Sequence, residues 1–254
     1  MQRSFARLIV VGAALTLFGA SCIRFGDGGA AQGAAGGVFK TADRGQLWQQ
    51  KSAISTPSGA KNFGGANIIT LAVDPQDHLA VYVGTKEHGM LYSYDGGESW
   101  SQTKGVSSGY VAAVAVDPRN KCTIYAAVGN QILKSEDCNR TFQEVFRESL
   151  PNSFVASIVI YPQNPAIIYA ATTQGIVVKS TDRGNSWARL ADFRGRIVNL
   201  VVDPGNPNLV YVSIRERGVW KSEDGTNFRD LSPALKPIKD AKDTGWVLAG
   251  SYYY

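Results

Sequence analysis

The chain has 254 residues, 44% of them apolar and 19% charged, which is the composition of a folded globular protein rather than a disordered one. Its net charge of +5 is modest for this length, so the dense basic face of a nucleic-acid-binding protein is not expected. The 2 histidines and 3 cysteines exclude a protein rich in zinc or haem sites, but not catalysis by carboxylates. The 27 glycines and the aromatic share of 10% favour strands and turns over helices.

Residues 1–22 have the features of an export signal. Two arginines precede an apolar run from Leu8 to Phe18, and small residues follow it. This run is shorter than the roughly 20 residues that a membrane-spanning helix needs. Cys22 comes directly after the small residues, which resembles the lipidation site of bacterial lipoprotein signals, although Gly19 stands where that pattern usually has Leu. A simple signal peptide cut nearby is the alternative.

Residues 23–36 are rich in glycine and alanine and hold almost nothing to bury, so they predict a flexible tether. Lipids on Cys22 followed by this tether would hold a folded domain of residues 37–254 at a membrane surface. We therefore expect a protein that is exported from the bacterial cytoplasm and anchored on the periplasmic or extracellular side of a membrane.

Internal repeats fill most of the remaining chain. Five segments align on the pattern Ser/Thr-x-Asp-x-Gly-x-x-Trp/Phe, and their aspartates lie 52, 42, 45 and 42 residues apart. These aspartates are Asp43, Asp95, Asp137, Asp182 and Asp224. Out of phase with them, strand–turn–strand segments recur at 71–85, 114–128, 158–172 and 200–214. Together the two series give a unit of about 43 residues with four short strands, which is the blade of a β-propeller.

The aspartate turn has a physical logic. The carboxylate can accept hydrogen bonds from backbone amides of its own turn, the glycine permits a positive φ, and the aromatic ring anchors the turn on the core. These residues resemble the Asp-box, or BNR repeat, of sialidases, sortilin-type receptors, two-propeller xyloglucanases and photosystem II assembly factors. The resemblance covers about residues 36–231 and implies that the five aspartates are structural and lie far from the ligand-binding face.

The expected fold is all-β, a β-propeller of four-stranded antiparallel blades with Asp-box turns. It is either a ring of about five blades or part of a six- to eight-bladed ring. The chain opens with only the last two strands of a blade, at 37–50, and a further strand is predicted at 245–254. That further strand would pair beside the first two and close a five-bladed ring.

The two cysteines of the repeats, Cys122 and Cys138, fall at the same end of neighbouring antiparallel strands of one blade. We expect them to form a disulfide, because an exported protein meets an oxidising compartment. Two buried free thiols are the alternative.

Binding residues are expected at the end of the propeller opposite the aspartate turns, because the turns between second and third strands and the connections between blades meet there. We call this the top end, and the opposite one the bottom end. The binding candidates at the top end are six basic residues, the first four of them over one blade: Arg194, Arg196, Arg215, Arg217, Lys86 and Arg147. The guanidinium fork suits carboxylates, phosphates or acidic peptides. Solvated loops without a partner are the alternative, and the next binding candidates are Tyr110, Phe154 and Phe193.

The sequence motifs and the carboxylates expected at the top end give little support for catalysis. The Arg-Ile-Pro signature of sialidases is absent, and the carboxylates expected at the top end are Glu87, Glu148, Asp192 and Glu216. Each has a lysine or arginine beside it or two residues away, which suits a charged rim better than a pair of glycosidase carboxyl groups. His78 belongs to a bottom turn and His88 to a top turn, so they cannot share a metal ion. We expect a non-catalytic protein with no metal site and no cofactor.

Among Asp-box proteins, the chain most resembles the photosystem II assembly factor (Ycf48-like) group, which are compact single propellers with an arginine patch. This resemblance implies a membrane-tethered binding or assembly-factor propeller that recognises a membrane protein, or another periplasmic or extracellular protein, through its top-end loops. No nucleic-acid partner is expected. The alternative is a carbohydrate-active or carbohydrate-binding propeller, sialidase-like or xyloglucanase-like, with a glycan as its ligand.

Overall fold

The computed structural model describes residues 36–56 and 59–232, and strands dominate its regular structure. The predicted signal segment with Cys22, the tether up to residue 35 and the strand expected at 245–254 lie outside these residues. In the described part of the chain, no helix is long and apolar enough to span a membrane.

Four antiparallel sheets form consecutive blades, each with its four strands in chain order. Blade I consists of β5 (Ile68–Asp74), β6 (Asp77–Thr85), β7 (Met90–Ser93) and β8 (Ser101–Gln102). Blade II consists of β9 (Val111–Asp117), β10 (Asn120–Val128), β11 (Gln131–Ser135) and β12 (Gln143–Arg147). Blade III consists of β13 (Val155–Ile160), β14 (Ile168–Thr172), β15 (Ile176–Ser180) and β16 (Ala188–Asp192). Blade IV consists of β17 (Ile197–Asp203), β18 (Asn206–Ile214), β19 (Gly218–Ser222) and β20 (Phe228–Asp230).

Two small sheets precede blade I, and a 3₁₀ turn, Lys104–Val106, lies between β8 and β9. Strands β1 (Phe39–Lys40) and β2 (Gln49–Gln50) pair with each other, as do β3 (Ala53–Thr56) and β4 (Gly59–Asn62). The first pair is the one expected at 37–50, whereas neither repeated pattern predicts the second. Of the roughly five blades expected from the sequence, four are complete within the described residues.

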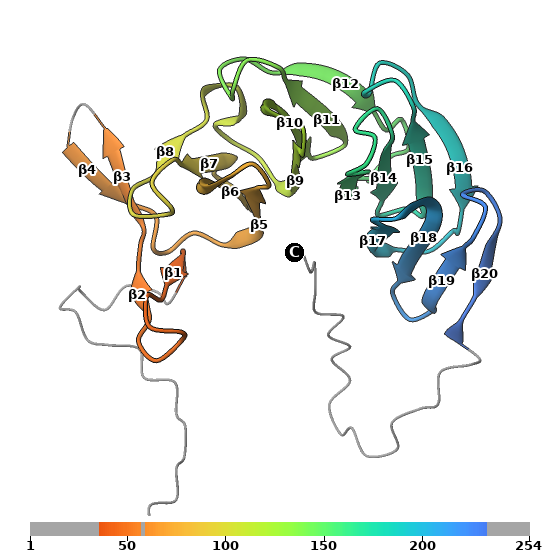
Figure 1. The fold of residues 1–254 in the computed structure, drawn as a ribbon, viewed down its shortest axis with the longest axis horizontal. Helices are drawn as coiled ribbons and strands as arrows, with labels where there is room; N and C mark the ends of the chain where they lie inside the picture. Colours follow the sequence, from red (N-terminus) through yellow and green to blue (C-terminus); the bar gives the residue numbers. More distant parts are fainter. Residues whose placement is uncertain (1–35, 57–58, 233–254) are drawn as a thin grey trace, which may run out of the picture.

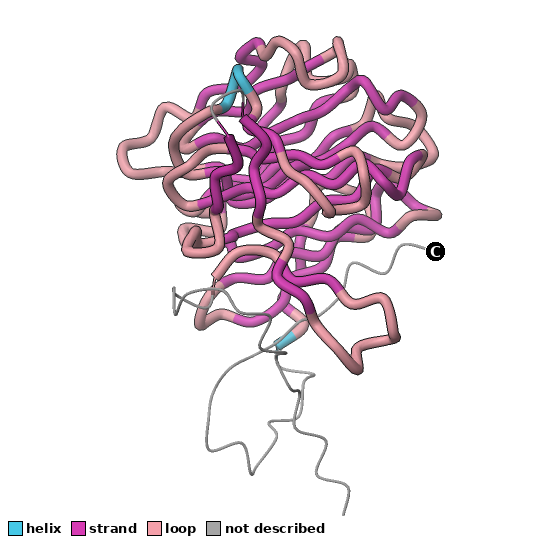
Figure 2. Tube along the Cα trace, turned by 90° about the vertical axis from the view of Figure 1, so that its left-hand side faces the viewer, coloured by secondary structure: helices cyan, strands magenta, loops and turns pink. Residues whose placement is uncertain are grey.

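The blades follow one another along an arc, with β5, β9, β13 and β17 on its inner side (Figure 1). Seen from the side, strands of successive blades run next to one another and the loops lie at their ends (Figure 2). Both views show the propeller arrangement that the repeats predict, so the expected all-β fold of four-stranded antiparallel blades is confirmed.

In blades II and III, a tyrosine in the second strand helps to join the blade to the next one. Tyr125 and Tyr169 are 1% and 0% exposed. The hydroxyl of Tyr125 donates to the backbone carbonyl of Arg183 in blade III, and that of Tyr169 donates to the carbonyl of Pro207 in blade IV, both at 2.8 Å. Each contact therefore combines burial of a large ring with a satisfied polar tip.

Both ends of the arc keep apolar sheet surface exposed. Tyr211 holds the equivalent position in blade IV but is only half-buried, and Val201, its cross-strand partner, is 47% exposed. On blade I, Leu71 and Val73 are 54% and 47% exposed on the face that the small sheets cover only in part. The strand expected at 245–254 would be one means of covering such a face, and its pairing stays a prediction.

The aspartate turns are held by side-chain hydrogen bonds at the bottom end. In the β15–β16 turn, the Asp182 carboxylate accepts from the backbone amide of Ser186 at 2.8 Å and from the hydroxyl of Ser180 at 2.7 Å. The Ser180 hydroxyl in turn accepts from the amide of Gly184, whose φ of +85° favours glycine. Trp187 donates from Nε1 to the carbonyl of Val145 in blade II at 3.0 Å. The turn therefore closes blade III and also attaches it to the preceding blade.

Hydrogen bonding to these carboxylates lowers their pKa values. Bonds from the hydroxyl and amide of Ser186 and from the Ser180 hydroxyl bring the pKa of Asp182 from 3.8 to about 2. Burial raises the pKa of Asp95, but hydrogen bonds from Ser93 and Ser99 outweigh it and give about 2. Hydrogen bonds also lower the pKa values of three other turn aspartates, Asp43, Asp137 and Asp224.

The depressed pKa values predict loss of stability in acid. A carboxylate whose pKa is lower in the folded than in the unfolded state stabilises the fold above the unfolded value of about 3.8 and loses this effect as the pH falls toward 2. We expect the urea midpoint to be level near neutral pH and to drop between about pH 4 and about pH 2. Asp182→Asn should show a smaller drop, and a wild-type midpoint that is unchanged at pH 2 would contradict the prediction.

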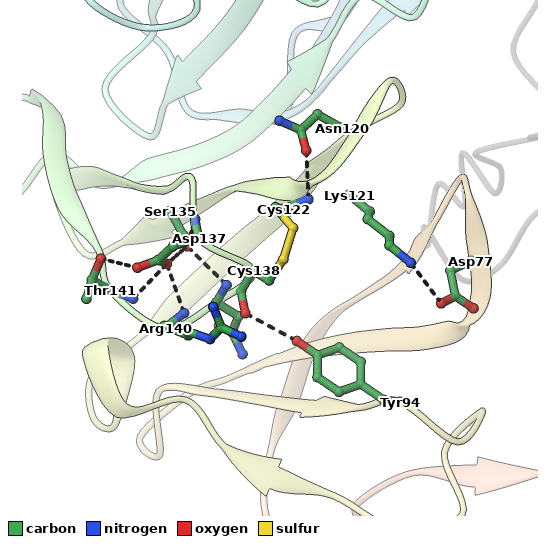
Figure 3. The surroundings of a disulfide bond; sticks show 11 residues. Asp77, Tyr94, Asn120, Lys121, Cys122, Ser135, Asp137, Cys138, Arg140 and Thr141 are labelled. Atoms are coloured by element: carbon green, nitrogen blue, oxygen red, sulfur yellow. Dashed lines mark hydrogen bonds and ion pairs between the residues drawn. A yellow bond between two sulfur atoms is a disulfide. The ribbon is translucent and has the colours of Figure 1, made fainter.

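A disulfide joins Cys122 of β10 to Cys138 in the β11–β12 turn, the pairing expected from the sequence (Figure 3). The backbone amide of Cys138 also donates to the carbonyl of Cys122 at 3.1 Å. Cys138 has a φ of +58°, and its carbonyl accepts from the hydroxyl of Tyr94 in blade I at 3.5 Å. The bond thus fixes the turn of blade II that contacts blade I.

Candidate functional site

A cavity of about 560 Å³ opens at the top end, where three loops of blades II to IV meet. The β12–β13 connection, the β14–β15 turn and the β16–β17 connection form it. Its lining residues are Leu150, Asn152, Phe154, Thr173, Gln174, Asp192, Arg194, Gly195 and Arg196. The β14–β15 turn lies at the opposite end of β15 from Asp182, so the cavity and the aspartate turns are on opposite ends of the propeller, as the sequence predicts.

The four arginines expected over one blade have different roles in the structure. Arg194 and Arg196 are exposed and line the cavity, and their guanidinium groups have no hydrogen-bond or ionic partner within residues 36–56 and 59–232. Arg217 donates from Nη1 to the backbone carbonyl of Phe193 at 2.6 Å, so it fastens the β16–β17 connection to the β18–β19 turn. Arg215 lies 3.6 Å from the carboxylate of its neighbour Glu216. The structure therefore brings two of the four to the cavity.

The other two basic candidates do not reach this cavity. Lys86 lies in the β6–β7 turn of blade I and pairs with Glu87 at 3.6 Å. Arg147, at the end of β12, places its guanidinium fork on Glu144, with Nε 2.8 Å from Oε1. Each of them is thus held by an acid close to it in sequence.

Two exposed aromatic residues lie at the cavity, Phe154 in its lining and Tyr110 in contact with Phe154. Tyr110 and Phe154 stand directly before the innermost strands of blades II and III, and they are 37% and 44% exposed. Their ring centroids are 6.5 Å apart with an interplanar angle of 65°. Arg196 occupies the same position before the innermost strand of blade IV. These three residues could have been found from the sequence, because each one directly precedes the first strand of its blade.

Phe193, the third aromatic candidate, is not a surface residue. It is 9% exposed and packs edge-on against Trp220 at 5.4 Å and Phe228 at 5.2 Å. Its ring therefore belongs to the core between blades III and IV, and the expectation of a surface aromatic residue at this position is wrong.

The four top-end carboxylates are all engaged by neighbours. Asp192 lines the cavity, where Oδ1 accepts from the backbone amide of Arg194 at 3.0 Å and Oδ2 lies 2.6 Å from Arg189. Glu148 is 7% exposed and accepts from the amide of Leu150 at 2.9 Å. Glu87 and Glu216 form the ion pairs given above. Of these four carboxylates, Asp192 is therefore the one that lines the cavity.

Within the described ranges, no group of three or more His, Cys, Asp or Glu side chains could hold a metal ion.

Comparison with known proteins gives partial matches. No family model matches the chain. Over 76 residues, 28% of its length, the chain is 30% identical to the oligoxyloglucan-reducing-end-specific xyloglucanase of Emericella nidulans, of which the match covers 9%. The crystal structure of an ancestral GH74 enzyme matches 64% of this chain and 23% of its own, with a TM-score of 0.55 and 26% identity. The GH74 xyloglucanase of Xanthomonas campestris matches 75% of this chain and 34% of its own, with a TM-score of 0.61 and 17% identity.

This chain spans less than two thirds of the length of each of these proteins. The structural match at 17% identity shows the propeller fold alone. The other two matches, at 26% and 30% identity, also show similarity in sequence. The chain shares the fold of these enzymes. The expectation of a non-catalytic protein is contradicted, because the relative matched in sequence is a xyloglucanase and the solved structure matched at 26% identity is a GH74 enzyme. None of these matches supports a protein partner.

Proposed function

We propose that the chain is a carbohydrate-active propeller whose top end binds a β-glucan of the xyloglucan kind. The observation that carries this proposal is the exposed pair Tyr110 and Phe154, beside a cavity of about 560 Å³. Aromatic rings offer flat apolar faces at small conformational cost, and such faces match the apolar faces of sugar rings. The xyloglucanase similarity in sequence points to the same ligand class.

The polar residues of the cavity suit a sugar. Asn152, Thr173 and Gln174 supply hydroxyl and amide groups, which donate to and accept from sugar hydroxyls. Together with Phe154, they give a mostly polar wall with an apolar face at one side. A predicted export signal would bring this surface to a compartment where polysaccharides occur.

The aspartate turns have a separate part in this proposal. Their hydrogen-bond pattern and their place at the bottom end support their assignment as Asp-boxes, which leaves them a structural role. A protein partner of the assembly-factor kind is the second candidate function, favoured by the guanidinium groups of Arg194 and Arg196, which have no partner in the described part of the chain.

The proposal is tested by binding of a xyloglucan heptasaccharide to the full chain in isothermal titration calorimetry. Tyr110→Ala/Phe154→Ala should weaken binding by about tenfold or more, because it removes both stacking faces. Tyr94→Ala is the matched control, since Tyr94 is 51% exposed in the β7–β8 turn at the bottom end. Equal affinity of the wild type and the double variant would overturn the proposal.

Release of reducing ends from xyloglucan is measured on the same preparations. Turnover that falls in Asp192→Asn, with heptasaccharide affinity retained, would assign the cavity carboxylate to hydrolysis. Binding without turnover by the wild type would assign this chain to recognition alone.

A further inference from the structure

The cavity has a cationic side that a neutral glucan does not require. Arg194 and Arg196 both line it and are both exposed, and no described carboxylate neutralises either of them. The one acid of the cavity, Asp192, already lies 2.6 Å from Arg189. Two positive charges at this wall are therefore left for a ligand.

The backbone that carries the two arginines is tightly held. The amide of Phe193 donates to the carbonyl of Gly175 at 2.9 Å, and the amide of Arg215 donates to the carbonyl of Arg196 at 2.8 Å. Gly195, between the two arginines in sequence, packs closely against the neighbouring strand and turn, because a Cβ there would lie 3.0 Å from Ile214 and 3.3 Å from Arg217. The arginine pair therefore projects from a connection whose backbone is already ordered, which lowers the entropic cost of ligand binding.

The lining combines three kinds of contact within one cavity. The guanidinium forks match a carboxylate in two-point hydrogen bonds. Phe154 offers an apolar face, while Asn152 and Gln174 offer amide groups for hydroxyls. A ligand that uses all three is a sugar ring that carries a carboxylate.

We propose that Arg194 and Arg196 form a subsite for a uronate residue of an acidic glycan. This inference rests on the proposed carbohydrate function and narrows its substrate class. The stacking pair Tyr110 and Phe154 takes the neutral part of the chain, and the uronate carboxylate lies against the arginines.

The test compares cellobiouronic acid with cellobiose, which differ by one carboxylate, in titrations of the full chain. The wild type should bind cellobiouronic acid about tenfold or more tightly than cellobiose, and the preference should shrink as salt rises from about 50 to about 500 mM. Arg194→Ala/Arg196→Ala should abolish the preference, so that the two disaccharides bind with equal affinity. Arg194→Lys/Arg196→Lys should keep the salt dependence but lose most of the preference, because lysine lacks the fork.

Arg44→Ala is the matched control. Arg44 is exposed in the β1–β2 turn at the bottom end, and no described residue pairs with its guanidinium group. The control should retain the full preference for cellobiouronic acid, which separates a local subsite from the effect of net charge.

Different failures identify different errors. Equal affinity for the two disaccharides, with cellobiose binding still dependent on Tyr110 and Phe154, would overturn the uronate subsite and leave the proposed function standing. If the protein binds neither of the two disaccharides nor xyloglucan, the uronate subsite and the proposed function are both overturned. A tetraglutamate peptide that binds as tightly as cellobiouronic acid through the same arginines would overturn the sugar assignment in favour of an acidic protein segment.

Discussion

Trp100→Ala is expected to lower the free energy of unfolding by about 3–5 kcal/mol, the usual cost of removing a buried large aromatic side chain. Trp100 is 1% exposed and meets the ring of Phe63 edge-on at 5.7 Å. Its Nε1 donates to the carbonyl of Lys51 at 2.8 Å, and its backbone amide donates to the carbonyl of Ala53 at 3.0 Å. The residue thus packs the segment before blade I onto that blade. Urea denaturation followed by circular dichroism measures the effect.

Trp48→Ala is the matched control for this substitution. Trp48 has the same place in its own aspartate turn, but it is half-buried, and its Nε1 donates to the carbonyl of Gly45 in that turn, at 3.2 Å, rather than to a neighbouring blade of the described chain. The expected loss is about 1 kcal/mol or less. Trp100→Phe, which keeps most of the ring but leaves the Lys51 carbonyl unpaired, should cost about 1–3 kcal/mol. Equal losses for Trp48→Ala and Trp100→Ala would contradict the assignment of Trp100 to the junction.

Cys122→Ser/Cys138→Ser is expected to lower the free energy of unfolding by about 3 kcal/mol. The disulfide closes a loop across a sequence separation of 16 residues, and it restricts the unfolded chain more than the folded one. The loss should spread to blade I, because the Cys138 carbonyl accepts from Tyr94 there. The urea midpoint measures the total effect.

Reductant provides the control for the disulfide. It should move the wild-type urea midpoint to that of the double serine variant and leave the variant unchanged. Thiol labelling of the denatured, unreduced protein should modify neither Cys122 nor Cys138. A wild-type midpoint that does not respond to reductant would contradict the prediction.

The sequence determined the blades because their signals are local. Each strand and turn is encoded within a few residues, by alternating apolar side chains and by the turn-forming Asp, Gly and Asn. The second repeated segment illustrates the accuracy: it is predicted at 114–128, and β9 and β10 occupy Val111–Asp117 and Asn120–Val128. The disulfide could be predicted for the same reason, since antiparallel neighbours in one blade fix which ends meet.

Only the tertiary structure decided the site. Arg194 and Arg217 are alike in sequence, but the second donates to Phe193 across the β16–β17 connection, whereas the first is left facing the cavity. Phe193 and Phe154 occupy similar loops, yet one is buried among aromatic rings and the other is exposed beside Tyr110. Which partner captures a side chain depends on loops about 20 to 40 residues apart meeting in space, and no local pattern encodes that competition.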